Sequence, residues 1–301
     1  MPLRSQLHVD QLLSNLSARY VNESRIADQL FPKVAVKKTT DLYRVYDRNF
    51  KLPETNRAVK GISREYSFEV SNSSYSLELH SLKDYIADIE KENYDLSDLK
   101  ADAVLNLTDK ISLRKEKSVA DLMTSTSWSQ VSSLTAAQQW DGTTTANPIT
   151  MVDSATTVIL ENSGMMANVM LIPWRALIAA KNNTQVIERI KYTSADITPN
   201  MIAGLFDKEK LLVPKAVIDS AADGLTPTVS ALFADHCLVA YVAPSAGPRQ
   251  VSAGYIFQND RPLVKSWRDE EREAEAVEVN IEYQAKVVCS LAGYLIKDCV
   301  A

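Results

Sequence analysis

The chain has 301 residues, 46% of them hydrophobic and 24% charged, an ordinary composition for a soluble globular protein with a large core. No apolar run approaches the roughly 20 residues that a membrane-spanning helix needs, and the start of the chain shows no secretory signal pattern. The net charge of −5 is uneven: residues 1–64 hold 12 basic and 6 acidic residues (+6), and the remaining 21 basic and 32 acidic residues give −11. Opposite charges of this kind favour a contact between subunits, or they keep the N-terminal segment soluble.

The first predicted elements are a short amphipathic helix in residues 9–21 and an extended segment at 30–38. A long hairpin follows over residues 41–70. Its two alternating runs flank some sixteen residues with much charge and few apolar side chains; the runs carry Tyr43 and Val45, then Tyr66, Phe68 and Val70. Most hairpin loops are only a few residues long, so this hairpin would have little of its own chain to pack on.

The spacing of the apolar residues then changes to three- and four-residue steps, which predicts one helix of about 30 residues. Apolar residues recur at three- and four-residue steps from Leu96 to Met123, and Asp95 is placed to cap the start. An apolar stripe with charges opposite predicts a helix that lies across a surface as a beam. The alternative is a long core helix of an α-rich enzyme.

Residues 150–260 alternate between helical and strand patterns, which predicts a compact α/β region. Asn147-Pro148 and the preceding Thr-rich segment end the beam, and Gly164 is placed as the C-cap of the next helix. The remaining predictions are strands near 168–174, 215–219 and 236–244, and helices at 174–183, 184–190 and from Thr198 on. The tail alternates strictly from Val277 to Tyr283, the strongest strand signal in the chain, and a last strand follows Gly293.

No catalytic or metal-binding constellation emerges. The three histidines, His8, His80 and His236, lack a second ligand at metal-site spacing, since adjacent His236 and Cys237 would point to opposite faces of a strand. Cys289 and Cys299 fit as small apolar residues of the tail strands. Eight glycines without a phosphate-binding or nucleophile-elbow motif argue against nucleotide enzymes and serine hydrolases. The acidic run at 268–278 predicts a solvated face or a partner for basic groups. Basic and aromatic residues in the hairpin could form a nucleic-acid surface, but interspersed acids dilute it. We therefore predict no enzymatic activity, cofactor or metal.

The order of arm, charged hairpin, beam helix, α/β region and closing strands resembles the major capsid proteins of tailed double-stranded-DNA bacteriophages. "WDGTTTANPI" with "NVMLIPWRAL", and the tail "RPLVKSWRDEEREAEAVEVNIEYQAKVVCSLAGYLI", are similar to segments of that family. The resemblance implies an α+β protein with the Hong Kong 97-type capsid fold, which encapsulins share. It comprises an N-arm, an extended E-loop hairpin, a P-domain with a long spine helix, and an α/β A-domain.

The resemblance implies that the chain is divided into an N-terminal arm (1–38), the E-loop hairpin (39–80), the P-domain (81–149) and the A-domain (150–261). Residues 262–301 supply closing strands of the P- and A-domains, and the spine helix falls within 85–127. In this family the E-loop and the N-arm lie over a neighbouring subunit. The inter-subunit contact is therefore assigned to the hairpin's cations: Arg44, Arg48, Lys51, Arg57, Lys60 and Arg64.

The implied function is a structural shell protein that self-assembles through hexamers and pentamers into an icosahedral container for double-stranded DNA. Packaged DNA would lie on the inner face, with a portal, a decoration protein and, because the beam follows a short arm, a separate scaffolding protein as partners. The protein would be part of the virion, assembled in the host cytoplasm and away from membranes. An encapsulin-type compartment, a soluble α/β enzyme, and a tail or decoration protein are the alternatives.

Overall fold

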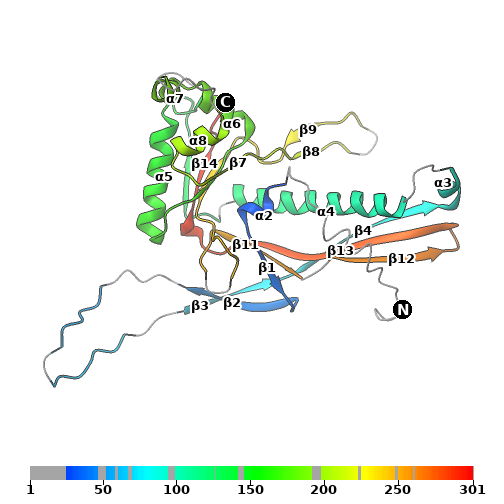
Figure 1. Cartoon of the computed structure of the whole chain (residues 1–301), viewed down its shortest axis with the longest axis horizontal. Helices are drawn as coiled ribbons and strands as arrows, with labels where there is room; N and C mark the ends of the chain where they lie inside the picture. The colour runs from blue at the N-terminus through cyan, green and yellow to red at the C-terminus, as the bar shows by residue number, and fades with distance from the viewer. Residues whose placement is uncertain are drawn as a thin grey trace.

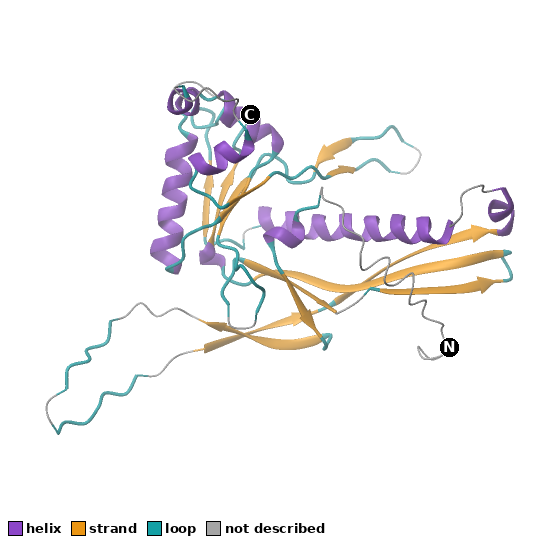
Figure 2. Ribbon diagram, viewed as in Figure 1, coloured by secondary structure: helices purple, strands orange, loops and turns teal. Residues whose placement is uncertain are grey.

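The protein is elongated, with two β-sheets set at an angle to each other and a long helix lying along one of them (Figures 1 and 2). An arm extends from one end of the body, and a shorter hairpin projects from the α/β part. This computed structural model describes residues 25–46, 52–57, 60–66, 70–93, 99–125, 127–141, 146–191, 198–222, 225–247, 250–259 and 262–300.

The first sheet is organised around the long strand β13 (Ala274–Val287), which the alternation of the tail predicts. On one side β13 pairs antiparallel with β4 (Glu78–Ala87), and on the other side with β12 (Leu263–Asp269) and β11 (Gly254–Asn259). A fifth strand, β1 (Lys33–Val36), joins in parallel to β11. The sequence analysis grouped β11 with the α/β region, but its backbone hydrogen bonds place it in this sheet.

The predicted long helix is α4 (Leu99–Thr124), whose 26 residues lie along β13 and β4 (Figure 1). Its apolar side is buried against Val277, Val279 and Tyr283 of β13, so the prediction of a beam on a surface is confirmed. The proposed cap Asp95 lies outside the described residues. A short helix, α3 (Asp88–Asn93), follows β4 at the far end of the sheet.

The second sheet and its helices form the α/β part, close to the predicted pattern. The strand order is β5-β14-β10-β6-β7, so the last strand of the chain lies beside strands from its middle. The strands are β5 (Gln130–Ser133), β6 (Val169–Leu171), β7 (Lys210–Leu212), β10 (Cys237–Ala240) and β14 (Gly293–Lys297). The helices are α5 (Pro148–Ser163), α6 (Trp174–Asn182), α7 (Thr184–Ile190) and α8 (Pro199–Leu205), with a 3-10 turn, η2 (Ser290–Ala292), before β14.

The helix α5 begins earlier than the sequence predicted. The sequence predicts a turn at Asn147, but its side-chain oxygen accepts hydrogen bonds from the backbone N–H of Ile149 at 3.1 Å and of Thr150 at 3.3 Å. Asparagine at the N-cap followed by proline at the first helical position is a favourable helix start. The end of α5 is as predicted, because Gly164 is its C-cap with φ of 65°.

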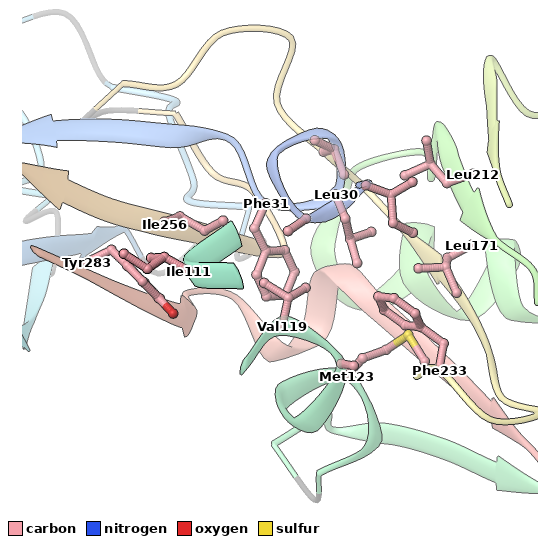
Figure 3. Close-up of a cluster of buried hydrophobic side chains, with 14 of the residues drawn as sticks. Leu30, Phe31, Ile111, Val119, Met123, Leu171, Leu212, Phe233, Ile256 and Tyr283 are labelled. Carbon is pink, nitrogen blue, oxygen red and sulfur yellow. The ribbon is translucent and has the colours of Figure 1, made fainter. Parts of the chain in front are cut away.

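The main core lies where α4, the first sheet and the α/β part meet (Figure 3). Leu30 and Phe31 are fully buried there beside Val119 and Met123, with Leu171 and Phe233 from the α/β part; the short helix α2 (Ala27–Leu30) positions them. The resemblance implied an N-terminal arm that lies over a neighbour. For the described residues from Ile26 to Phe31 that expectation is wrong, because these apolar side chains complete the core of their own subunit.

Two hairpins extend beyond the sheets. The first pairs β2 (Thr40–Tyr46) with β3 (Val70–Ser76), with Tyr46 opposite Val70. The predicted second strand therefore begins at Val70 rather than at Tyr66, and 23 residues (47–69) separate the paired strands. The second hairpin pairs β8 (Val217–Asp219) with β9 (Val229–Ala231).

Replacing Gly293 by alanine is expected to destabilise the subunit by about 1–3 kcal/mol, the usual cost of overpacking a core. A Cβ at Gly293 would lie far inside van der Waals contact with Cζ3 and Cε3 of Trp128. The buried indole cannot easily move, because its Nε1–H donates to the carbonyl of Met123 at 2.9 Å. Urea unfolding of dissociated subunits measures the effect. Gly204→Ala is the control, since a Cβ at Gly204 in α8 meets no atom within 4 Å, and an unchanged midpoint for Gly293→Ala would contradict this packing.

Candidate assembly surfaces

The arm between β2 and β3 stands clear of the body (Figures 1 and 2). Its described residues, 52–57 and 60–66, belong to no helix or strand, and nearly all of them are exposed. The contacts that they make join the arm to itself: Arg64 pairs with Glu54 at 2.7 Å, and Arg57 donates to the hydroxyl of Ser63 at 2.9 Å. Among the described residues, the arm is joined to the body through the hairpin base.

The base of this hairpin is held on the first sheet by an aromatic cluster. Tyr75 stacks on Phe257 of β11 with ring centroids 4.7 Å apart, and Tyr43 lies 5.2 Å from the same ring. Lys286 of β13 donates to the carbonyl of Ser74 at 2.6 Å. These contacts fix the base of the long hairpin on its own subunit, whereas the described residues of the arm stay exposed.

The structure describes only part of the predicted contact set. Arg57, Lys60 and Arg64 are exposed on the arm, and Lys60 has a positive φ of 67°. Arg44 lies in β2 opposite Asn72, and its side chain is not described. The remaining two, Arg48 and Lys51, lie outside the described residues. Of the three that are described, Arg64 pairs with Glu54 of the same arm, and the contact with another subunit stays a prediction for the whole set.

Two apolar arm residues were missed by the sequence analysis. Leu52 is 96% exposed and Ile62 is 95% exposed, and Tyr66 beside them is 55% exposed. Single exposed apolar residues are common, but Leu52 and Ile62 are almost fully exposed on a projecting arm, and contact with a second subunit would bury them. Their signal in the sequence is only that of isolated apolar residues among charges, which is weak before the exposure is known.

The acidic residues of the tail lie at the opposite end of the first sheet from the arm (Figure 1). In the turn between β12 and β13, Glu270, Glu271 and Glu273 are exposed. The predicted role of this run as a partner for basic groups is confirmed within the subunit for Glu275, which pairs with Lys91 at 2.9 Å and also with Lys100. Burial works against ionisation of Glu275, but the two lysines outweigh it and lower its pKa.

The residues that might have carried chemistry have structural surroundings. His80 stacks on Tyr283 at 4.1 Å, and burial lowers its pKa; His236 Nδ1 accepts from the backbone N–H of Asp298 at 3.1 Å. His8 lies outside the described residues. Cys237 and Cys299 are buried in the α/β core, and burial raises the pKa of the Cys237 thiol.

Within the described ranges, no group of three or more histidine, cysteine, aspartate or glutamate side chains is placed to hold a metal ion. In the same part of the chain, no helix has the length and apolar character required to cross a membrane.

The structural comparison defines the class: this is the Hong Kong 97-type capsid fold, as the sequence predicted. The fold matches a phage-related protein from Bordetella bronchiseptica RB50 with a TM-score of 0.78 and 22% identity, covering 97% of this chain and 98% of that one. It also matches the capsid protein in the capsid structure of cyanophage P-SCSP1u with a TM-score of 0.63 and 11% identity, covering 92% and 89% of the two chains.

The sequence comparison identifies homologous proteins within this fold class. The chain is 27% identical over 299 residues to the major capsid protein of Burkholderia phage BcepMu, covering 96% of this chain and 95% of that protein. No protein-family model matches the chain. Taken with the shared fold, the alignment over nearly the whole length makes the chain a homologue of phage major capsid proteins.

Proposed function

We propose that the chain is a structural subunit that assembles with copies of itself into an icosahedral shell enclosing double-stranded DNA. The observation that carries this proposal is the arm, whose apolar side chains at Leu52 and Ile62 are left almost fully exposed by the described part of their own subunit. A container built from many copies supplies that cover, because every arm then meets the body of a neighbour. Similarity to a phage major capsid protein favours a DNA container over an enzyme-loaded compartment.

The finer assignments belong to the same proposal. The arm with its hairpin base is the E-loop, α4 is the spine helix of the P-domain, and the α/β part is the A-domain around which hexamers and pentamers close. Arg44, Arg48, Lys51, Arg57, Lys60 and Arg64 are proposed to contact the adjacent subunit. We also propose DNA on the inner face, a scaffolding protein, a portal and a decoration protein as partners, in a virion assembled in the host cytoplasm. The shell role calls for no catalytic activity.

Electron microscopy of the purified protein tests the proposal, and shells or rings of subunits are the expected result. Limited trypsin digestion adds an independent reading. Free subunits are expected to be cut at Arg57 or Arg64 on the arm, and assembled subunits are expected to resist cleavage there. A protein that stays monomeric at high concentration, with an arm that is protected in the monomer, would contradict the proposal.

Replacing Leu52 and Ile62 together by serine is expected to weaken assembly more than removing the charges of Arg57 and Arg64. Burying a large aliphatic side chain contributes about 1.5–3 kcal/mol, whereas an exposed ion pair contributes about 0–1 kcal/mol. Light scattering against protein concentration measures the threshold for assembly in each variant.

The control for this comparison is Leu160→Ser, because Leu160 is also exposed but lies on α5 in the α/β part. Its unfolding and that of the arm variants should match the unaltered subunit. A larger rise in the assembly threshold for Arg57→Gln with Arg64→Gln than for the two serine substitutions would show that charge, rather than apolar burial, seats the arm.

A further inference from the structure

The β8–β9 hairpin is a second projection without cover. All three residues of β9 are exposed, and Val217 and Val229 are 54% and 62% exposed. Leu225, in the turn region, is 68% exposed. An isolated two-stranded hairpin is marginally stable in water. Next to the paired strands, the Asp219 carboxylate accepts from the backbone N–H of Ala221 at 3.0 Å and of Thr228 at 2.8 Å.

A cavity of about 460 Å³ lies at the base of the same hairpin, against the start of α6. Phe233 lines this cavity and is itself fully buried in the main core (Figure 3). Its apolar wall includes Pro173, Pro214 and Trp174, and the Trp174 side chain is 57% exposed. A pocket of this size can take the side chains of a short protruding segment.

The hairpin and the cavity at its base differ in charge. Residues 218–231 contain Asp219 and Asp223 and no lysine or arginine. The cavity is bordered by Lys215 and by Arg175, which pairs with Asp235 at 3.0 Å. Opposite charges at two sites favour one orientation of a contact and disfavour others.

The hairpin cannot fill its own cavity, because its turn points away from its base (Figure 1). Resting on the proposed function, we infer that the turn of the β8–β9 hairpin of one subunit inserts Leu225 into the cavity between α6 and the hairpin base of the next subunit. This contact is head-to-tail: each copy gives a turn and receives one. Repeated head-to-tail contacts close into a ring when the rotation between copies closes, which suits capsomers of five or six.

Cross-linking of assembled protein tests this inference. Thr226→Cys places a thiol beside Leu225, and Ala234→Cys places one at the cavity edge, both in a background in which Cys289 is alanine; Cys237 and Cys299 are buried. The variant with both new thiols is treated with a short bis-maleimide after assembly, and the products are separated under denaturing conditions. A ladder of covalently joined chains is expected, because each link connects two copies.

Two matched pairs of thiols serve as comparisons. Thr226→Cys with Thr157→Cys on α5 should give no ladder. Ser63→Cys with Ala234→Cys asks whether the arm, rather than the hairpin, occupies the cavity; a ladder from this pair alone would overturn the inference. Shells seen by electron microscopy without any ladder from the Thr226–Ala234 pair would also overturn it and leave the proposed function standing. If neither shells nor rings form, the proposed function fails, and the inference falls with it.

Discussion

Shortening the arm is expected to abolish shell assembly while leaving the subunit as stable as before. Residues 47–69 would be replaced by Asn-Gly, a two-residue turn that suits antiparallel strands, because Tyr46 and Val70 already face each other across the hairpin. The described arm residues contact only one another, so their loss removes no packing from the body. Electron microscopy and sedimentation measure assembly, and thermal unfolding measures the subunit.

A control of equal length separates the role of the arm's side chains from the role of its bulk. In this control the arm keeps its 23 residues, and Leu52, Ile62 and Tyr66 are changed to serine. We expect this chain to fold and to assemble poorly, between the unaltered and the shortened proteins. Normal shells from the shortened chain would overturn the view that the arm joins subunits. A shortened chain that fails to fold would instead show that the arm supports its own subunit.

The regular elements were largely predictable from the sequence because local rules fix them. The strict alternation from Val277 to Tyr283 identified β13, the longest strand of the first sheet, and the unbroken apolar stripe identified α4. Two capping residues were also predicted correctly. Gly164 is the C-cap of α5, and the Thr198 hydroxyl accepts from the backbone N–H of Met201 at 3.4 Å. Asn147 was misread because asparagine followed by proline suits both a turn and a helix start.

The features that depend on the fold as a whole were not predictable. No local pattern says that Leu30 and Phe31 leave the N-terminal segment to fill a core formed by α4 and the α/β part. Likewise, β11 joins β13 through contacts between segments about thirty residues apart. The arm was recognised from its charge and length, but the exposure of Leu52 and Ile62 needed three-dimensional information. The sequence therefore pointed to the interface region and missed its apolar residues.

Replacing Glu116 by alanine is expected to destabilise the subunit by about 2–6 kcal/mol. Glu116 is fully buried, and its carboxylate accepts from the backbone N–H of Ile26 at 3.0 Å and of Ala27 at 2.8 Å. Each buried donor left without a partner costs about 1–3 kcal/mol. Urea unfolding of dissociated subunits measures the loss. Asp121→Ala is the control, because Asp121 lies on the same helix, is 63% exposed and pairs only with Lys117 among the ion pairs of the described residues.

The loss of stability in Glu116→Ala should affect the whole N-terminal segment whose backbone Glu116 contacts. Asp28 pairs with Lys115 of α4 at 2.8 Å, which ties this segment to the helix, and with Lys33 of β1 at 2.7 Å. Burial opposes the ionisation of Asp28, but the two lysines outweigh it and lower its pKa. Hydrogen exchange at Leu30 and Phe31 should therefore quicken in Glu116→Ala. Unchanged exchange there would show that the ion pairs alone hold the segment.

The pH dependence of Glu116→Gln tests the charge state of this buried group. Burial raises the pKa of Glu116 above 4.5, although the N–H groups of Ile26 and Ala27 and the charge of Arg25 oppose the shift, and Asp28 adds to it. A carboxyl whose pKa is higher in the folded state contributes stability at low pH, and that contribution is lost as pH rises through the raised pKa. Glutamine cannot lose a proton, and it keeps one acceptor oxygen.

The advantage of glutamate over glutamine in unfolding free energy should therefore shrink between pH 4 and pH 7, with the pH 4 value near the cost of one unpaired donor, about 1–3 kcal/mol. Asp28, whose pKa is lowered, titrates in both proteins, so only its interaction with Glu116 remains in the difference. If the advantage grows with pH instead, the two backbone N–H groups and Arg25 outweigh burial, and Glu116 is held as a carboxylate. In either case the difference reports the ionisation of Glu116 together with its interactions with Arg25 and Asp28, because the two chains share every other titrating residue.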